Sequence, residues 1–455
     1  MTPRLALFLL LTFLSCRIDG AALVQKEDRI GEATQNKRRL RGDCILCSNQ
    51  RPLTRKTLEK VGTITQIIDT AVDVRFVDSP VPELWNALEV SLPDGSSRII
   101  LEVAEILSET DVRTIAMSST DGLPRGAECV DTGKPIQVPV GLATLGRIVN
   151  VLGETVDEKG PLSVDAYAPI HQKNAIKSET PTGPKIMLET GIKAIDLLTP
   201  YTRGGKIGLV GDVEVDKTAI MTNFMGSITQ NGGTSVVVGV GAPEGNHLYN
   251  KMIEDGIIKI SEKTGSTVGS SAALVYGQMD DTPGACARLT LTGLAMAKCL
   301  SDTRESDTLL FVDNTFRFAQ ASAAVSALLG QIPPADNYQS FLTIAPEGFQ
   351  GANGAMTKGA VTLIRSIHAT ADDLTDPAKI AELAGLDAAT VLSTSMTELG
   401  IFPTIDPLAS TSALLSAELI DENHYQVAKR VKEILRNYIS TKAVKFEKEE
   451  AVNLA

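Results

Sequence analysis

Residues 206–218 read KIGLVGDVEVDKT, an apolar run that leads into a loop containing glycine, three acids and a final lysine–threonine pair. A short apolar run bounded by glycine is typical of a buried strand, and the loop after it has the outline of a strand-to-helix turn. Comparable apolar runs alternate with helical stretches further along the chain, at 235–240, 273–276 and 308–312. This alternation predicts βα units and a central α/β domain with a mainly parallel sheet.

Two segments upstream of this domain have a different pattern. Residues 61–76 and 86–104 alternate apolar and polar side chains, with Gly, Pro and Asp at the turns. A period of two is typical of strands that bury one face and expose the other. The pattern therefore predicts a small antiparallel β-barrel before the α/β domain.

The composition is that of a folded, multidomain protein. The chain has 455 residues, of which 43% are hydrophobic and 22% charged, enough for two or three domains with a sizeable core. Its formal net charge of -12 argues against nucleic acid or an anionic membrane as partner, because both usually require a basic face. We therefore expect no nucleic-acid partner.

Residues 1–21 have the features of a secretory signal peptide. Arg4 precedes an apolar run at 5–14, which gives way to small and polar residues up to Ala21. A membrane anchor is the alternative, but about ten apolar residues fall short of the roughly twenty that span a bilayer. No other segment of the sequence resembles a transmembrane helix. We therefore predict a secreted chain without a membrane span.

Residues 22–58 are polar and charged without sustained periodicity, which predicts an exposed leader. Within it stands a basic run composed of Arg38, Arg39, Leu40 and Arg41. One interpretation is a solvated charge run or a protease site. The run also resembles the RxLR motif of secreted effectors of oomycete plant pathogens, and this resemblance implies delivery into a host cell. The sequence departs from that family in lacking the acidic element that often follows the motif.

Several phrases of the body resemble the ATP synthase β-subunit, with gaps, from about residue 61 to residue 438. They read AVDVRF at 71–76, NALEV at 86–90, RTIAM at 113–117, GGKIGL at 204–209 and ADDLTDP at 371–377. The resemblance implies three domains. These are a β-barrel at 59–139, a RecA-like P-loop domain at 140–410, and a truncated helical region with a tail at 411–455.

The phosphate loop of this family has the form GxxxxGK followed by Ser or Thr, and its backbone N–H groups wrap around phosphate oxygens. Gly211, Lys217 and Thr218 match that form, but Asp216 replaces the second glycine. A carboxylate about 4 Å from a phosphate costs on the order of 4 kcal/mol at an effective dielectric constant near 20. We therefore predict a degenerate, vestigial nucleotide site. The alternative is that Asp216 points outward and the loop still binds nucleotide.

The resemblance also assigns the groups around the attacking water and the metal. Ala242 stands where the family has its catalytic glutamate, and an alanine cannot accept a proton. Glu244 aligns with a later, metal-associated glutamate. Asp313 ends an apolar run as a Walker B aspartate does, and with Thr218 and Glu244 it forms the vestigial magnesium site that we predict. A structural cap is the alternative for Asp313.

Three more positions follow from the resemblance. Arg317 matches a family arginine near the γ-phosphate, and Cys286 replaces another family arginine. Phe402 matches the aromatic residue that stacks on adenine, where tyrosine is usual, and stacking on phenylalanine is chemically adequate. An ordinary core phenylalanine is the alternative.

Together these features predict a secreted effector that acts in a host plant cell by binding host proteins, and that modulates or suppresses defence-linked cell death. Its ATP synthase β-like body is expected to be a pseudo-ATPase and not an enzyme, with no catalytic residue and no cofactor apart from residual MgATP binding. Two alternatives remain. One is an ATP-binding and ATP-hydrolysing β-subunit, and the other is a decoy that mimics β and joins rotary ATPase subunits.

Overall fold

The computed structural model describes residues 60–92, 98–164, 166–171, 185–211, 217–260, 267–330, 359–368, 385–398 and 400–453. All of them belong to one compact unit, Cys44–Ala455. The predicted signal peptide, the leader with its basic run and Asp216 lie outside the described residues, so the expectations placed on them stay predictions.

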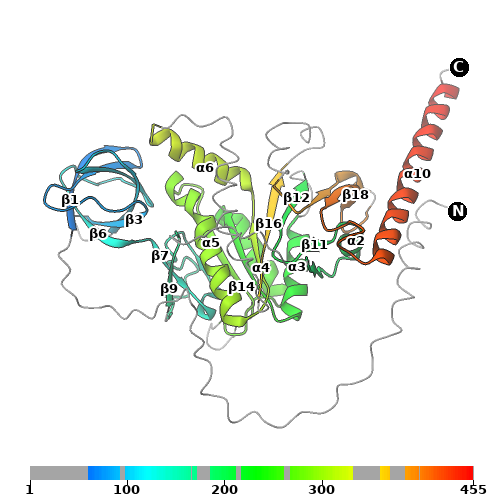
Figure 1. The fold of residues 1–455 in the computed structure, drawn as a ribbon, viewed down its shortest axis with the longest axis horizontal. Helices are drawn as coiled ribbons and strands as arrows, with labels where there is room; N and C mark the ends of the chain where they lie inside the picture. Colours follow the sequence, from blue (N-terminus) through cyan, green and yellow to red (C-terminus); the bar gives the residue numbers. More distant parts are fainter. Residues whose placement is uncertain are drawn as a thin grey trace, which may run out of the picture. The chain divides into compact units, whose positions relative to one another are not determined.

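A closed barrel of antiparallel strands forms the first part of this unit, in the order β1-β2-β5-β4-β3-β6 (Figure 1). Its interior is filled by apolar side chains such as Val72, Val74 and Leu101, none of which is exposed. Closure leaves no strand edge open for pairing with another chain. The predicted barrel is thereby confirmed. Its strands are β1 (Lys60–Ile68), β2 (Ala71–Arg75), β3 (Asn86–Ser91), β4 (Arg98–Ile106), β5 (Asp111–Ala116) and β6 (Glu128–Pro135).

The central domain is built on a sheet with the strand order β18-β17-β12-β16-β15-β13-β14-β8. Neighbouring strands are parallel throughout, except for the antiparallel pair β17–β18. The predicted mainly parallel sheet is therefore confirmed. Its strands are β8 (Ile148–Val149), β12 (Lys206–Gly211), β13 (Thr234–Val240), β14 (Ala272–Gly277), β15 (Thr308–Val312), β16 (Val361–His368), β17 (Ala388–Leu392) and β18 (Ile405–Ser412).

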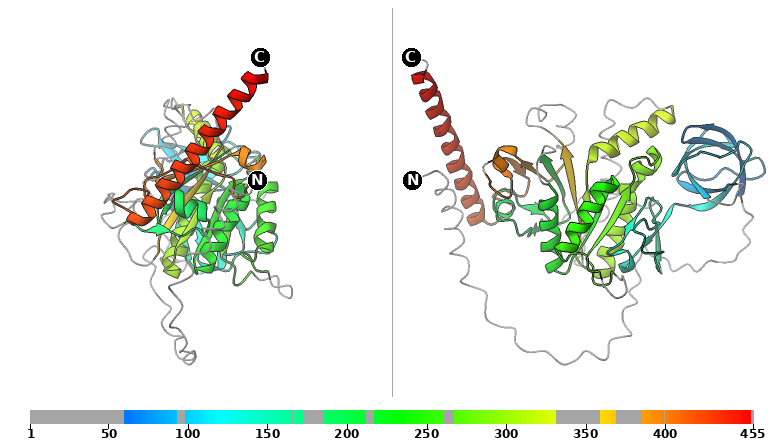
Figure 2. Two further views of the ribbon diagram at one scale, coloured as in Figure 1. Left: turned by 90° about the vertical axis from the view of Figure 1, so that its right-hand side faces the viewer. Right: turned by 180° about the vertical axis from the view of Figure 1, so that it is seen from behind.

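Helices cover both faces of this sheet (Figure 1, Figure 2). Val236 and Val238 of β13 share one hydrophobic cluster with α5 and α6, whereas Val237 shares a second cluster with α3 and α4. Successive strand residues point to opposite faces, so an uninterrupted apolar strand can serve both helical layers. These helices are α3 (Lys217–Gln230), α4 (Ala242–Glu254), α5 (Pro283–Arg304) and α6 (Thr315–Leu328).

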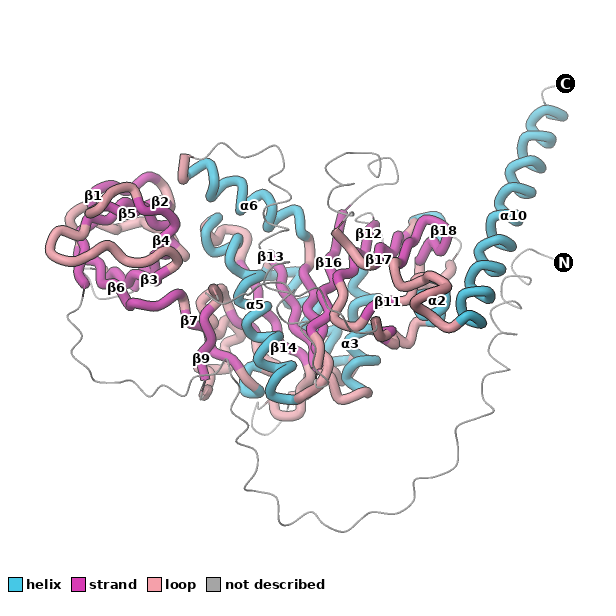
Figure 3. The backbone as a smooth tube through the Cα atoms, in the orientation of Figure 1, coloured by secondary structure: helices cyan, strands magenta, loops and turns pink. Residues whose placement is uncertain are grey.

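Shorter elements connect the larger ones, and Figure 3 separates strands, helices and loops by colour. Two small sheets pair β7 with β9 and β10 with β11. The connecting elements are β7 (Gln137–Val140), η2 (Leu142–Thr144), β9 (Ala166–Pro169), β10 (Met187–Leu188), α2 (Lys193–Leu198), β11 (Tyr201–Thr202) and α9 (Thr394–Glu398).

A single long helix, α10 (Glu422–Asn453), is the last described element, as the predicted helical C-terminal region requires. Its first turns pack onto the central domain. Ala428 is fully buried there, and His424 Nε2 lies 2.9 Å from the carbonyl oxygen of Leu197 in α2. Among the described helices, none combines the length and the apolar character needed to cross a bilayer.

Candidate functional site

The carboxyl ends of the parallel strands bring several predicted site residues to one edge of the sheet. Gly211 ends β12, Val240 ends β13, and Asp313 directly follows β15. In open α/β sheets, ligands bind in the crevice outside the carboxyl ends of the strands. The candidate site is therefore this edge.

The described residues on either side of the predicted phosphate loop are Gly211, at the end of β12, and Lys217, at the start of α3. A Cβ on Gly211 would lie 2.9 Å from Leu392 Cβ on β17, so only glycine fits there without a shift. Lys217 begins α3 and is buried, and Thr218 beside it is half-buried. The first N–H groups of a helix lack intrahelical partners and favour an anion. Lys217 and Thr218 thus stand at a helix start that can receive phosphate.

The turn from β13 into α4 contains residue 242, where the resemblance to the family predicts a glutamate. Gly241 has a φ of 124°, which favours glycine, and its N–H donates to Gly277 O at 2.9 Å. Ala242 is the first residue of α4, and Glu244 follows in the same turn. The backbone therefore places residue 242 at the carboxyl edge of β13, where the resemblance to the ATP synthase β-subunit predicted it.

The connection from β15 into the first turn of α6 contributes an acidic residue, Asp313, and a basic residue, Arg317. The N–H of Asp313 donates to Val238 O at 2.9 Å, which ties the end of β15 to β13. Asn314, not Asp313, is the N-cap residue of α6. The capping alternative for Asp313 is therefore wrong at α6. Arg317, in the first turn of α6, donates from Nη1 to Val240 O at 3.2 Å and so reaches the end of β13.

The start of α5 lies beyond the end of β14 and holds a carboxylate that the sequence comparison missed. Asp281 accepts from the N–H of Gln278 at 2.8 Å, and burial raises the pKa of its carboxyl group. Thr282 caps α5 by accepting from Ala285 N at 3.2 Å. Asp281, Thr282 and Pro283 follow the apolar strand after three residues, and an acid before threonine and proline is a helix-start pattern that the sequence already offered.

Cys286 lies in the first turn of α5, with its thiol 4.0 Å from Asp281 O. Burial and the nearby Asp281 raise the pKa of the thiol to about 11, although the Arg317 guanidinium opposes the shift. The thiol is therefore protonated at neutral pH, where a thiolate would be needed for nucleophilic attack. Its proximity to Arg317 places residue 286 beside the candidate site.

Phe402 lies between α9 and β18, in the segment that leaves the carboxyl end of β17 and returns as β18. Strand β17 neighbours β12, so this segment is at the same edge of the sheet as the phosphate loop. The Phe402 side chain is 57% exposed. The alternative of an ordinary core phenylalanine is therefore wrong, and stacking on adenine stays a prediction.

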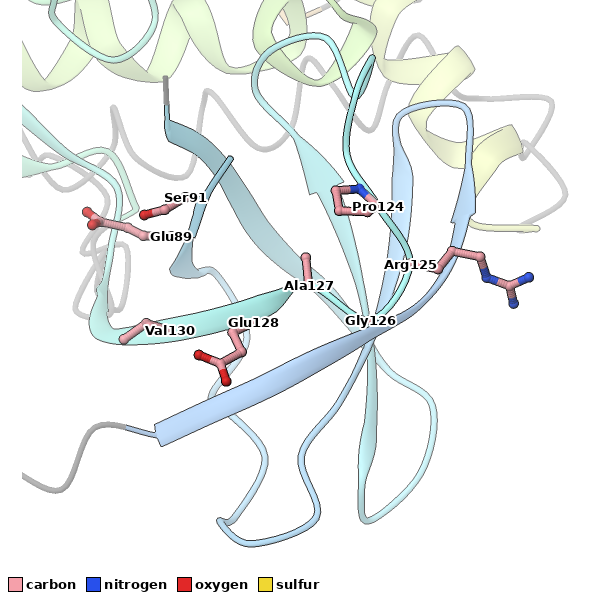
Figure 4. A pocket seen from close by; sticks show the side chains of 8 residues that line it. All are labelled: Glu89, Ser91, Pro124, Arg125, Gly126, Ala127, Glu128 and Val130. Carbon is pink, nitrogen blue, oxygen red and sulfur yellow. The ribbon is translucent and has the colours of Figure 1, made fainter. Parts of the chain in front are cut away.

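A separate hollow lies on the barrel, between β3, β6 and the turn before β6 (Figure 4). None of its lining residues is a predicted site residue, and its charged groups are two carboxylates and one guanidinium. It is lined by Glu89, Ser91, Pro124, Arg125, Gly126, Ala127, Glu128 and Val130.

Two family models match the chain, and together they cover well over half of it. The β-barrel domain of the ATP synthase alpha/beta family matches residues 64–133, and the nucleotide-binding domain of that family matches residues 191–412. The chain belongs to the ATP synthase alpha/beta family. The second match contains the whole candidate site, from the β12–α3 turn to Phe402.

The family assignment corrects the prediction that the chain is not an enzyme. Both matching models describe domains of ATPase-type subunits, so the prediction that the chain is not an enzyme is wrong for the family to which it belongs. It rested on Asp216 and on the side chain at 242. These two positions do not remove the helix start at Lys217, nor Asp313 and Arg317 at the same edge of the sheet.

Proposed function

We propose that this chain is an ATP-binding and ATP-hydrolysing subunit of the ATP synthase alpha/beta type. One observation carries the proposal: Lys217 begins α3 directly after the β12 turn, inside the matched nucleotide-binding domain. Lys217 and the N–H groups of the first turn of α3 supply the donors that phosphate oxygens need. The substrate is MgATP.

Other residues at this edge of the sheet have defined tasks in the proposed site. The Thr218 hydroxyl and the Asp313 carboxylate hold the magnesium of MgATP, which is usually bound through one or two protein groups and the phosphates. Arg317 compensates the charge that develops on the phosphate during transfer. The exposed ring of Phe402 stacks on the adenine.

Lys217→Ala is expected to weaken MgATP binding by about 10- to 100-fold, because a charge-assisted hydrogen bond to phosphate contributes roughly 1.5–3 kcal/mol. Calorimetry on the purified chain measures the dissociation constant, and phosphate release measures turnover. Lys429→Ala, at an exposed position on α10, is the matched control and should change neither quantity. Equal binding by the Lys217 variant and the wild type would remove the observation on which the proposed function rests.

Rotary ATPase subunits are the partners that this function implies. Subunits of the alpha/beta family act as parts of rotary assemblies, and the chain carries both the barrel and the nucleotide-binding domain of that family. We propose that it joins or competes within such an assembly.

A second proposal rests on the sequence of the N-terminal segment. The apolar run at 5–14 and the basic run at 38–41 favour export followed by action in a host plant cell, where the chain would modulate or suppress defence-linked cell death by binding host proteins. This proposal concerns where the protein acts, and it is compatible with nucleotide binding by the body.

Fusing residues 1–30 to a secretion-dependent reporter is expected to export the reporter, because the short apolar run is the core of a signal peptide. Reporter activity outside the cell is the measurement. The double change Leu9→Arg and Leu10→Arg charges the apolar run and should abolish export. Retention of the unmodified fusion, or its import into mitochondria, would rule out the host-cell proposal.

A further inference from the structure

Glu102 is a buried carboxylate shared by three segments of the chain. It lies on β4 of the barrel, and its side chain is 0% exposed. Its Oε1 accepts from Arg288 of α5, at 2.8 Å from Nε and 2.7 Å from Nη2. Its Oε2 lies 2.9 Å from Nε2 of His171, which follows β9. Each carboxylate oxygen thus has a basic partner from outside the barrel strands.

The carboxylate is ionised because its partners outweigh its burial. Burial alone raises the pKa of Glu102, but the Arg288 charge and the hydrogen bond from His171 lower it to about 2. An ionised carboxylate only accepts hydrogen bonds, so His171 Nε2 is the donor. Removing one partner of a buried charge pair is costly, because the remaining charge is left uncompensated. The three side chains therefore form one electrostatic unit.

The same helix is held to the barrel at its N-cap residue. Thr282, the N-cap of α5, donates from Oγ1 to Ala116 O at the end of β5, at 3.0 Å. A Cβ on Gly284 would lie 2.4 Å from Ile115 Cγ2, so the helix start lies directly against β5. Arg288 adds the ionic contact to β4 within the second turn of α5. The barrel thus fixes the beginning of α5 through polar, steric and ionic contacts.

That part of α5 belongs to the candidate nucleotide site. Asp281 precedes the helix at the carboxyl edge of β14, and Cys286 is close enough to Arg317 for the guanidinium to act on the pKa of its thiol. Arg317 in turn contacts the end of β13. A shift of the first two turns of α5 would therefore move the groups next to Arg317.

We propose that Glu102 is a positioning residue for the nucleotide site, which acts by holding Arg288 and so fixing the first two turns of α5 beside Arg317. The proposal rests on the proposed nucleotide-binding function and assigns a part of it to the barrel. Small displacements of positioned groups weaken a site strongly, because its geometry is adjusted to the ligand.

The chain contains an intrinsic reporter for this unit. Trp85 is its only tryptophan, and its ring stacks on His171 with centroids 5.3 Å apart and planes 10° from parallel. Tryptophan emission therefore monitors His171, which contacts the same Glu102 carboxylate as Arg288. If the start of α5 moves on nucleotide binding, the emission of Trp85 should change.

The test uses the full chain and MgADP. Glu102→Gln is expected to weaken MgADP binding about tenfold by calorimetry, because Arg288 loses its ionised partner. MgADP should change Trp85 emission in the wild type and not in this variant. Asp111→Asn is the matched control, because Asp111 also pairs with an arginine on the barrel, Arg75, at 2.7 Å, but the Arg75 side chain is 53% exposed. Binding by the control should stay at the wild-type level.

The outcomes separate the two proposals. If the wild type binds no MgADP, the nucleotide function fails and the role of Glu102 fails with it. If the wild type binds and Glu102→Gln binds equally well, only the positioning role is overturned. If circular dichroism shows that Glu102→Gln is unfolded, Arg288→Lys replaces it, since lysine keeps the charge and loses the two-nitrogen contact. Arg288→Lys should then weaken binding about threefold, and wild-type affinity would overturn the role.

Discussion

Asp216→Gly is expected to strengthen MgATP binding by a factor that approaches a thousand. A carboxylate about 4 Å from a phosphate charge costs on the order of 4 kcal/mol at an effective dielectric constant near 20, and each 1.4 kcal/mol is about tenfold in affinity. Glycine also removes the Cβ and allows the backbone to approach the phosphates closely. Calorimetry with MgATP on the purified chain measures the change.

Two companion variants separate charge from shape. Asp216→Asn keeps the Cβ and removes the charge, so it should recover most of the gain if electrostatics dominates. Asp255→Gly removes an acid at the C-cap of α4, at the end of the helix remote from Ala242, and screening should keep its effect within about twofold. An unchanged dissociation constant for Asp216→Gly would mean that the carboxylate points away from the phosphates and that the loop tolerates it.

The strands that position the site were predictable because they are buried on both faces. The apolar runs at 206–210, 235–240, 273–276 and 308–312 match β12, β13, β14 and β15 to within one residue at each end. Helices cover both sides of a parallel sheet, so such strands are apolar throughout. The barrel segments 61–76 and 86–104 were recognisable for a different reason, because apolar and polar side chains alternate along much of their length.

The strands with mixed composition were not predicted. β16 carries Arg365 in its middle, although the side chain is buried, and β18 contains Asp406, Pro407 and three hydroxyl residues. Neither has an apolar run or a strict alternation. Their place in the sheet is decided by pairing with strands that are distant in sequence, as when Leu209 of β12 pairs with Ser366.

Contacts between residues that are far apart in the chain could not be predicted from the sequence either. Glu102 looks like one more charged strand residue, and its partners stand 69 and 186 positions away. Only the closed barrel and the start of α5 bring these groups together. The individual residues of the candidate site were found through resemblance to a known family. The helix start after Asp281 could be read from the sequence, but its place at the carboxyl edge of β14 could not.

Ala242→Glu is expected to raise the turnover number for ATP hydrolysis about a hundredfold, with a much smaller effect on the dissociation constant for MgATP. The backbone places residue 242 at the start of α4, at the carboxyl edge of β13 that Arg317 also contacts. A carboxylate there can accept a proton from the attacking water, and a positioned general base contributes about 10²–10⁴ in rate. Phosphate release under saturating MgATP measures the turnover number.

The control for this variant is Ala242→Gln, which has nearly the same size and can hydrogen-bond to water but cannot take up a proton. It should leave turnover close to that of the wild type, because orientation without proton acceptance provides only part of the catalysis. Equal stimulation by glutamine and glutamate would show that packing at the start of α4 limits the rate. No stimulation by either would show that another group, such as Glu244 two residues further along α4, already activates the water.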